Sequence, residues 1–253
     1  MKLKAIFARY FANNAMENET KTENSQRIQT SLLNAAEKKA LLWLAERQPR
    51  WTDSDMLTYV GHIGAVMIAL GFILSNFGVH FLWISVLGLV VNWYGDSLDG
   101  TLARVRKQQR PLYGFYIDHT MDAINESLMF IGAGLSPFMH FNLACVILVV
   151  YLMLTLNVAM NAHLRGEFRL TYAKLGPTEL RLICMVAITL LILINPLQTF
   201  SVEVPWVAGG AVQLRILDFV GAIILLALIV IYLVTIGQDA RYYAKIDPKH
   251  KNE

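Results

Sequence analysis

Six long runs of mostly apolar residues dominate this sequence of 253 residues. The runs cover residues 56–76, 79–94, 117–135, 138–161, 180–194 and 214–236. A helix needs about 20 mostly apolar residues to cross a bilayer. Only 16% of the residues are charged and 55% are hydrophobic, whereas a soluble domain carries about a quarter charged residues. The sequence therefore predicts an all-α integral membrane protein with six transmembrane helices.

Basic residues are distributed unevenly between the six runs. They fall before the first run, between the second and third, between the fourth and fifth, and after the sixth. The three other connections contain no Lys or Arg. Since cytoplasmic loops carry the excess of Lys and Arg, we expect both termini on the cytoplasmic side of a multi-pass membrane protein. A nucleic-acid partner would require a continuous basic face, and the sequence shows none.

The residues before the first run divide into two parts. Residues 1–27 are rich in Asn, Glu and Thr and are expected to form a flexible cytoplasmic segment. Residues 28–55 are expected to form an amphipathic juxtamembrane helix and a linker, because apolar residues recur every four positions. They are Ile28, Leu32, Ala36, Ala40 and Leu44. This helix lies on the membrane surface, which Trp43 and Trp51 favour, or it packs on the protein body. Residues 56–237 would form the six-helix transmembrane domain and residues 238–253 a basic cytoplasmic tail.

Acidic residues are concentrated where the second and third predicted spans approach the cytoplasmic side. Asp96 and Asp99 are three residues apart, and Asp118 and Asp122 are four apart, so each pair lies on one helix face. The two spans are antiparallel neighbours, so the four carboxylates can converge. Their mutual repulsion is relieved by divalent cations, and carboxylate oxygens suit Mg²⁺ or Mn²⁺. Two such ions about 4 Å apart can clamp a reacting phosphate.

Other ligand types are missing from this cluster. It offers neither thiolates nor paired histidines, which argues against zinc or copper. His119 is rotated about 100° from its neighbour Asp118 around the helix, so we interpret it as structural. Glu126 lies one turn beyond Asp122 and has two open interpretations. In a functional role it orients Asp122 or helps to hold a second substrate, and in a structural role it forms a hydrogen bond to a neighbouring helix.

Small residues and an arginine lie between the two acidic pairs. Gly100 and Ala103 leave space for a ligand near the backbone, and Gly114 leaves space one turn before Asp118. Arg104 offers a planar fork that suits phosphate oxygens. Taken singly, the arginine is also explained by membrane topology and the glycines by helix packing.

A second polar cluster lies between the fourth and fifth runs. Its members are candidates for binding a phosphate or a polyol as an acceptor substrate: Arg165, Arg169, Lys174, Glu179 and Arg181. Membrane topology, together with a helix start at Pro177, explains the same residues without a ligand.

In order, these residues read Asp96-x2-Asp99-Gly100-x2-Ala103-Arg104-x9-Gly114-x3-Asp118-x3-Asp122. This pattern resembles the signature of the CDP-alcohol phosphatidyltransferase family at all eight defining positions. The resemblance also covers the six spans and the preceding surface helix. One stretch departs from it: family members often enter the first span through Pro-Asn-x-Leu-Thr, where this chain has Ser-Asp-Met-Leu-Thr at residues 54–58.

The resemblance implies a fold, a reaction and residue roles. The fold is a six-helix membrane domain, often homodimeric, whose polar cavity opens to the cytoplasm. The reaction moves a phosphate-linked group from a CDP-alcohol, such as CDP-diacylglycerol, to an alcohol, with release of CMP. The four aspartates would bind two Mg²⁺ or Mn²⁺ ions, and Asp122 would also act as the base. The CDP part would contact Asp96, Asp99, Gly100, Ala103, Arg104 and Gly114.

A different class of protein also uses such acids. Carboxylates inside spans serve as ion relays in transporters. Transporter sites usually lie near the bilayer midplane, in repeated halves with broken helices, whereas these acids cluster at one end. The sequence therefore favours an enzyme of phospholipid synthesis over an ion-coupled transporter, and leaves the acceptor alcohol open.

Overall fold

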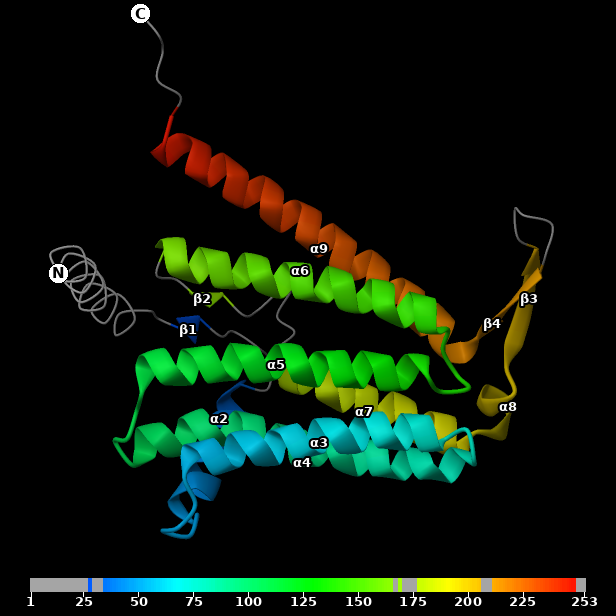
Figure 1. The fold of residues 1–253 in the computed structure, drawn as a ribbon, viewed down its shortest axis with the longest axis horizontal. Coiled ribbons are helices and arrows are strands. Elements are labelled where there is room, and N and C mark those ends of the chain that lie inside the picture. Colours follow the sequence, from blue (N-terminus) through cyan, green and yellow to red (C-terminus); the bar gives the residue numbers. More distant parts are fainter. Residues whose placement is uncertain (1–26, 29–33, 166–167, 170–176, 206–210, 249–253) are drawn as a thin grey trace, which may run out of the picture. The chain divides into compact units, whose positions relative to one another are not determined.

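The computed structural model describes residues 27–28, 34–165, 168–169, 177–205 and 211–248 (Figure 1). Seven helices of more than ten residues make up most of this part of the chain. They are α2 (Asn34–Glu46), α3 (Ser54–Leu74), α4 (Leu82–Val105), α5 (Pro111–Gly134), α6 (Phe141–Arg165), α7 (Pro177–Leu193) and α9 (Ile216–Ile246). Each of the six predicted spans thus corresponds to one helix, which confirms a mainly helical protein.

Within the described residues, four segments are long and apolar enough to cross a membrane: Ser54–Leu74, Val79–Val105, Phe141–Asn161 and Ile216–Ile246. The second joins the short 3₁₀ helix η1 (Val79–Phe81) to α4. The other two predicted spans correspond to α5, which carries three acids, and to α7, which has 17 residues. A spanning helix needs about 20 apolar residues, so the count of six spans stays a prediction.

Several helices are longer than their apolar runs. α4 continues past the apolar residues to Val105, and α5 begins at Pro111, six residues before the predicted start. As a result, both acidic pairs lie inside regular helices. α9 continues to Ile246, so part of the predicted basic tail is helical. Beyond each apolar run, polar residues continue the helix, because polar side chains are compatible with the headgroup region and with water.

The chain divides into two compact units. The first contains residues 1–66, 87–125 and 158–185, and the second contains residues 67–86, 126–157 and 186–253. The first unit holds α2, the N-terminal part of α3, the ends of α4 and α5 that carry the signature, and the start of α7.

In the first unit, α3 and α4 approach each other through glycines. A Cβ atom on Gly95 would lie 2.2 Å from the backbone nitrogen of Gly61, and one on Gly64 would lie 2.3 Å from that of Asn92. The buried side chain of Asn92 also donates from Nδ2 to the carbonyl of Gly61 at 2.9 Å. This close packing fixes α4 against α3 one turn before Asp96.

The face of α2 that packs within the first unit coincides only in part with the predicted one, because Leu44 of the predicted stripe is partly buried there. Leu41 and Ala45 are buried in a cluster with Leu57, Leu98 and Leu102, whereas Ala36 and Ala40 of the predicted stripe are exposed. Alanine contributes little apolar area, so the larger Leu41 decides the buried face. Trp43 stays 54% exposed. The interpretation in which this helix packs on the body therefore holds for α2, and contact with a membrane surface stays a prediction.

The second unit contains structure that the apolar runs did not predict. Strands β3 (Ser201–Pro205) and β4 (Ala211–Arg215) form an antiparallel pair after the short helix α8 (Asn195–Gln198). β4 leads directly into α9, where buried Asp218 accepts hydrogen bonds from the backbone nitrogens of His140 and Arg215 at 2.7 and 2.8 Å. Asp218 also pairs with Nδ1 of His140 at 2.6 Å. These bonds fix the start of α9 beside the start of α6.

Candidate active site

Three of the four signature aspartates come together in the first unit. Asp96 of α4 and Asp118 and Asp122 of α5 each place a carboxylate oxygen within 4.8 Å of the others. All three side chains are partly buried. The helical spacing explains this arrangement, because Asp118 and Asp122 lie one turn apart on one face of α5. We call these three residues the aspartate cluster.

The fourth signature aspartate is held by α3 and is not a member of this cluster. Thr58 donates from Oγ1 to Oδ2 of Asp99 at 2.7 Å, and the backbone nitrogen of Gly100 donates to its Oδ1 at 2.5 Å. Ser54 donates to the backbone carbonyl of Asp99 at 3.0 Å. The prediction that Asp99 lies on one face with Asp96 is compatible with this, but α3 determines the direction of its carboxylate.

The Thr58 hydroxyl has one proton and two nearby acceptors. Its oxygen lies 2.7 Å from Asp99 and 3.2 Å from the carbonyl of Ser54. Because a hydrogen bond to a carboxylate is shorter and stronger than one to a neutral carbonyl, the proton is assigned to Asp99. Thr58 was not among the predicted site residues. Its position at the end of the stretch 54–58, where family members often also have threonine, could have indicated a role.

An arginine from a distant part of the sequence contacts the aspartate cluster. Nη2 of Arg181, in α7, lies 2.5 Å from Oδ2 of Asp96, and the two side chains are 18% and 23% exposed. α7 begins at Pro177, as predicted, and Glu179 in its first turn is buried. Of the five acceptor candidates, the structure therefore brings Arg181 to the site.

Three of the acceptor candidates lie wholly or partly outside the described residues. Lys174 and the side chains of Arg165 and Arg169 lie outside the described residues, although the backbone places Arg165 at the end of α6 and Arg169 in β2. The short strand β2 (Phe168–Arg169) pairs in parallel with β1 (Arg27–Ile28).

α2 reaches the start of α7 through one carboxylate. Oε1 of Glu37 accepts a hydrogen bond from Nε1 of Trp93 in α4 at 3.1 Å, and the hydroxyl of Thr178 donates to the same oxygen. Thr178 is three residues before Arg181, and Trp93 is three residues before Asp96. Glu37 therefore joins the two helices whose next turns form the ion pair. No motif in the sequence indicated this role.

The small residues of the signature leave open space. Among the described residues, a Cβ atom on Gly114 would meet no heavy atom within 4 Å, and one on Gly100 would contact only Nη1 of Arg104 at 3.5 Å. Packing against this part of the chain therefore does not require glycine at either position. Arg104 is exposed, and its Nη2 donates to Oγ1 of Thr101 at 3.0 Å.

His119 makes contacts of a structural kind. Its Nδ1 lies 2.9 Å from the carbonyl oxygen of Phe115, and its ring stacks on that of Phe115 with centroids 4.1 Å apart. The aspartate cluster does not include it. These contacts agree with the structural interpretation.

The donor set of the cluster fits a divalent cation. Three carboxylates from two helices supply hard oxygen ligands, which Mg²⁺ and Mn²⁺ prefer. Three such charges within 4.8 Å also repel strongly unless a cation neutralises them. Asp96, Asp118 and Asp122 are thus the residues that would hold a metal ion.

Comparison with known proteins identifies the family of this chain. The family model for CDP-alcohol phosphatidyltransferases matches residues 51–236. A phosphatidylinositol phosphate synthase from Cutibacterium acnes is 32% identical over 81 residues, which cover 32% of this chain and 37% of that protein. The family match includes all four aspartates and the helices that carry them. The chain therefore belongs to the CDP-alcohol phosphatidyltransferase family.

Proposed function

We propose that this protein transfers a phosphatidyl group from CDP-diacylglycerol to the hydroxyl group of a small alcohol or phosphorylated alcohol, with release of CMP. The observation that carries the proposal is the aspartate cluster on α4 and α5, in a chain of the CDP-alcohol phosphatidyltransferase family. Phospholipid synthesis in a membrane suits a chain whose described part contains four helices long and apolar enough to span it.

The donor site is proposed to lie at the end of α4 and the start of α5. Gly100, Ala103 and Gly114 leave room for the CDP part beside the backbone, and a ligand would fill the space that packing leaves open. Arg104 would bind phosphate oxygens through its planar fork. Asp96 and Asp99 complete the proposed set of donor contacts.

Two divalent ions are proposed at the four signature aspartates. When bound, Mg²⁺ or Mn²⁺ would neutralise the negative charge of the pyrophosphate and of the departing CMP. Asp96, Asp118 and Asp122 fit this role directly, and Asp99 is proposed to join them from its position beside Thr58.

The transfer is proposed to occur in one displacement. The acceptor oxygen forms a bond to the phosphorus that carries diacylglycerol, while the bond from that phosphorus to the oxygen of CMP breaks and CMP leaves with the electron pair. The hydroxyl proton passes to the carboxylate of Asp122, which acts as general base. The signature supplies no serine, cysteine or histidine for a covalent intermediate, which supports direct attack.

The acceptor is proposed to carry a phosphate group that Arg181 binds. A guanidinium group suits a phosphate dianion, and Arg181 lies beside the cluster where the acceptor must react. The similar protein from Cutibacterium acnes is a phosphatidylinositol phosphate synthase, which supports a phosphorylated polyol. Glu179, Arg165, Arg169 and Lys174 remain proposed contributors.

The remaining proposals concern the arrangement in the membrane. Six spans with both termini and the active site on the cytoplasmic side agree with the distribution of Lys and Arg. A homodimer is proposed from the family resemblance.

The experiment that tests the function is a CMP-release assay on the purified protein. CDP-diacylglycerol and Mg²⁺ or Mn²⁺ are supplied with one acceptor at a time: inositol phosphate, glycerol phosphate, inositol, serine, ethanolamine or choline. We expect CMP release with a phosphorylated polyol and a lipid product of matching mass. Absence of CMP release with every acceptor would contradict the proposal, and uptake of an ion by proteoliposomes would favour a transporter instead.

A further inference from the structure

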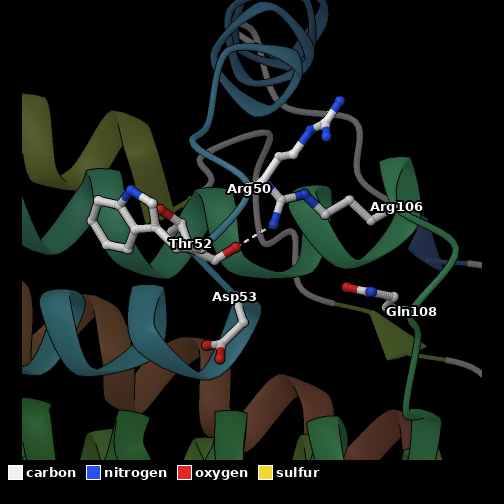
Figure 2. A pocket seen from close by; sticks show the side chains of 6 residues that line it. Arg50, Thr52, Asp53, Arg106 and Gln108 are labelled. Atoms are coloured by element: carbon white, nitrogen blue, oxygen red, sulfur yellow. Dashed lines mark hydrogen bonds between the residues drawn. The ribbon is translucent and has the colours of Figure 1, made fainter.

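A polar hollow lies at the junction between the α2–α3 linker and the end of α4 (Figure 2). Its lining residues are Arg50, Trp51, Thr52, Asp53, Arg106 and Gln108, and its volume is about 470 Å³. Ligand pockets commonly have volumes of about 300–1,000 Å³. None of these residues occupies a position of the signature or belongs to the aspartate cluster.

The sequence position of the lining residues places the hollow at the border between membrane and water. Residues 51–53 directly precede the span that begins at Ser54, and Arg106 directly follows the span that ends at Val105. The ends of spanning helices lie in the headgroup region. Trp51 is 73% exposed, as is typical of tryptophans at this level.

The structure holds the Arg106 guanidinium group in place at the hollow. It donates to the backbone carbonyls of Pro49 at 2.7 Å and Gln48 at 3.2 Å, and also to that of Thr52. Figure 2 shows the bond to Thr52. Three of the five N–H donors of an arginine are thereby used. Neutral carbonyls do not cancel the positive charge, so a fixed cation faces the hollow.

The other two charged groups leave the hollow basic. Arg50 is exposed. Asp53 accepts a hydrogen bond from the backbone nitrogen of Met56 at 2.7 Å, which caps the start of α3. In Figure 2 the Asp53 side chain extends away from the two arginines. Two guanidinium groups against one carboxylate give the lining a formal charge of +1.

We propose that this hollow binds the phosphate group of an anionic phospholipid of the surrounding bilayer. Guanidinium groups bind phosphate oxygens through paired N–H donors, and the membrane supplies phosphate at this depth. Basic pockets near span ends on the cytoplasmic side bind lipid headgroups in this way. Trp51 rests among the neighbouring lipids. The proposal requires a membrane-spanning chain but does not depend on the catalytic proposal.

The test measures lipid binding to the full chain in a neutral detergent. Short-chain phosphatidylglycerol and phosphatidylcholine are titrated separately, and bound lipid is counted by native mass spectrometry. We expect one phosphatidylglycerol to bind in preference to phosphatidylcholine. Arg50→Gln should weaken that binding about tenfold, as expected for loss of one charge-assisted hydrogen bond.

A matched variant separates a site from general surface charge. Lys39→Gln removes the same charge from an exposed position of α2 and should leave the binding of phosphatidylglycerol unchanged. An equal loss in both variants, or equal binding of the two lipids by the wild type, would overturn the proposal. Displacement of the lipid by inorganic phosphate at similar concentration would instead assign the hollow to a free anion and overturn the lipid as occupant.

Folding is checked independently of activity. Arg50→Gln should melt at the temperature of the wild type, because Arg50 is exposed. Arg106→Lys serves as the second variant: it keeps the charge but loses the planar fork, so it should also weaken phosphatidylglycerol binding several-fold. Unchanged binding in both arginine variants, with normal melting, would contradict the site.

Discussion

Arg181 lies 2.5 Å from Asp96, so one of the carboxylates expected to bind a metal ion is already paired with a cation from α7. The pair joins two segments that are 85 residues apart in the chain. It partly neutralises the aspartate cluster, which otherwise consists of acids alone. The positive charge of Arg181 is therefore expected to have two effects. It lowers the affinity of the aspartate cluster for a metal cation, and it raises the affinity for a phosphorylated acceptor.

Removal of the Arg181 charge should separate these effects. In Arg181→Gln, Asp96 loses its cationic partner, so the cluster becomes more negative and its affinity for Mn²⁺ should rise or stay constant. The Michaelis constant for a phosphorylated acceptor should rise about 10- to 100-fold, since a charge-assisted bond contributes about 1.5–3 kcal/mol. Calorimetry with Mn²⁺ and steady-state kinetics measure the two quantities. Weaker Mn²⁺ binding with unchanged acceptor dependence would show that Arg181 only holds Asp96.

The proposed donor role of Arg104 predicts a selective effect. Arg104→Lys keeps the charge but replaces the planar fork by a single ammonium group, so binding of CDP-diacylglycerol should weaken by about 1–3 kcal/mol. The measurement is a titration of CMP release against the donor at saturating acceptor. If the dependence on the acceptor changed instead, the two sites would have been assigned the wrong way round.

Asp122 is proposed to serve as both metal ligand and general base, and its replacement by asparagine distinguishes the two roles. If the proton-accepting role dominates, Asp122→Asn should retain metal-dependent donor binding and lose about 10²- to 10⁴-fold in turnover. Donor binding by calorimetry and CMP release are measured on one preparation across a metal titration. Parallel loss of binding and turnover, restored by added Mn²⁺, would leave Asp122 as a ligand only.

The hydrogen bond from Thr58 to Asp99 makes a prediction about a residue outside the signature. Thr58→Val removes the hydroxyl at similar volume, so Asp99 loses a bond of 2.7 Å. We expect the Mn²⁺ concentration needed for half-maximal CMP release to rise about tenfold or more. Thr58→Ser keeps the hydroxyl and serves as the matched control. Equal behaviour of the valine and serine variants would show that this bond does not position Asp99.

The features that the sequence predicted well depend on local regularity. Asp118 and Asp122 share a face of α5 because a helix repeats every 3.6 residues, and the long apolar runs indicated the main helices. The recurrence of apolar residues every four positions included Leu44 but did not predict that Leu41 and Ala45 are the buried residues of α2. There Leu41 and Ala45 meet Leu57, and this contact depends on the packing of α3 and α4.

The features that could not be predicted from the sequence depend on tertiary contacts. No spacing indicates that Glu37 accepts hydrogen bonds from both Trp93 and Thr178, because the three residues belong to three separate helices. The separation of Asp99 from the cluster likewise follows from a threonine on another helix. The hairpin of β3 and β4 lies in a stretch whose sequence indicates only a connection without Lys or Arg.

The most direct test of the account combines metal binding with catalysis on the same samples. Mn²⁺ binding is measured by electron paramagnetic resonance, and CMP release from CDP-diacylglycerol with inositol phosphate is measured in parallel. The wild type, Asp96→Asn and Asp118→Asn are compared. We predict that the wild type binds Mn²⁺ and releases CMP, that each variant loses both, and that EDTA abolishes turnover. Full CMP release in EDTA, or in both variants, would contradict a metal-dependent transferase at these aspartates.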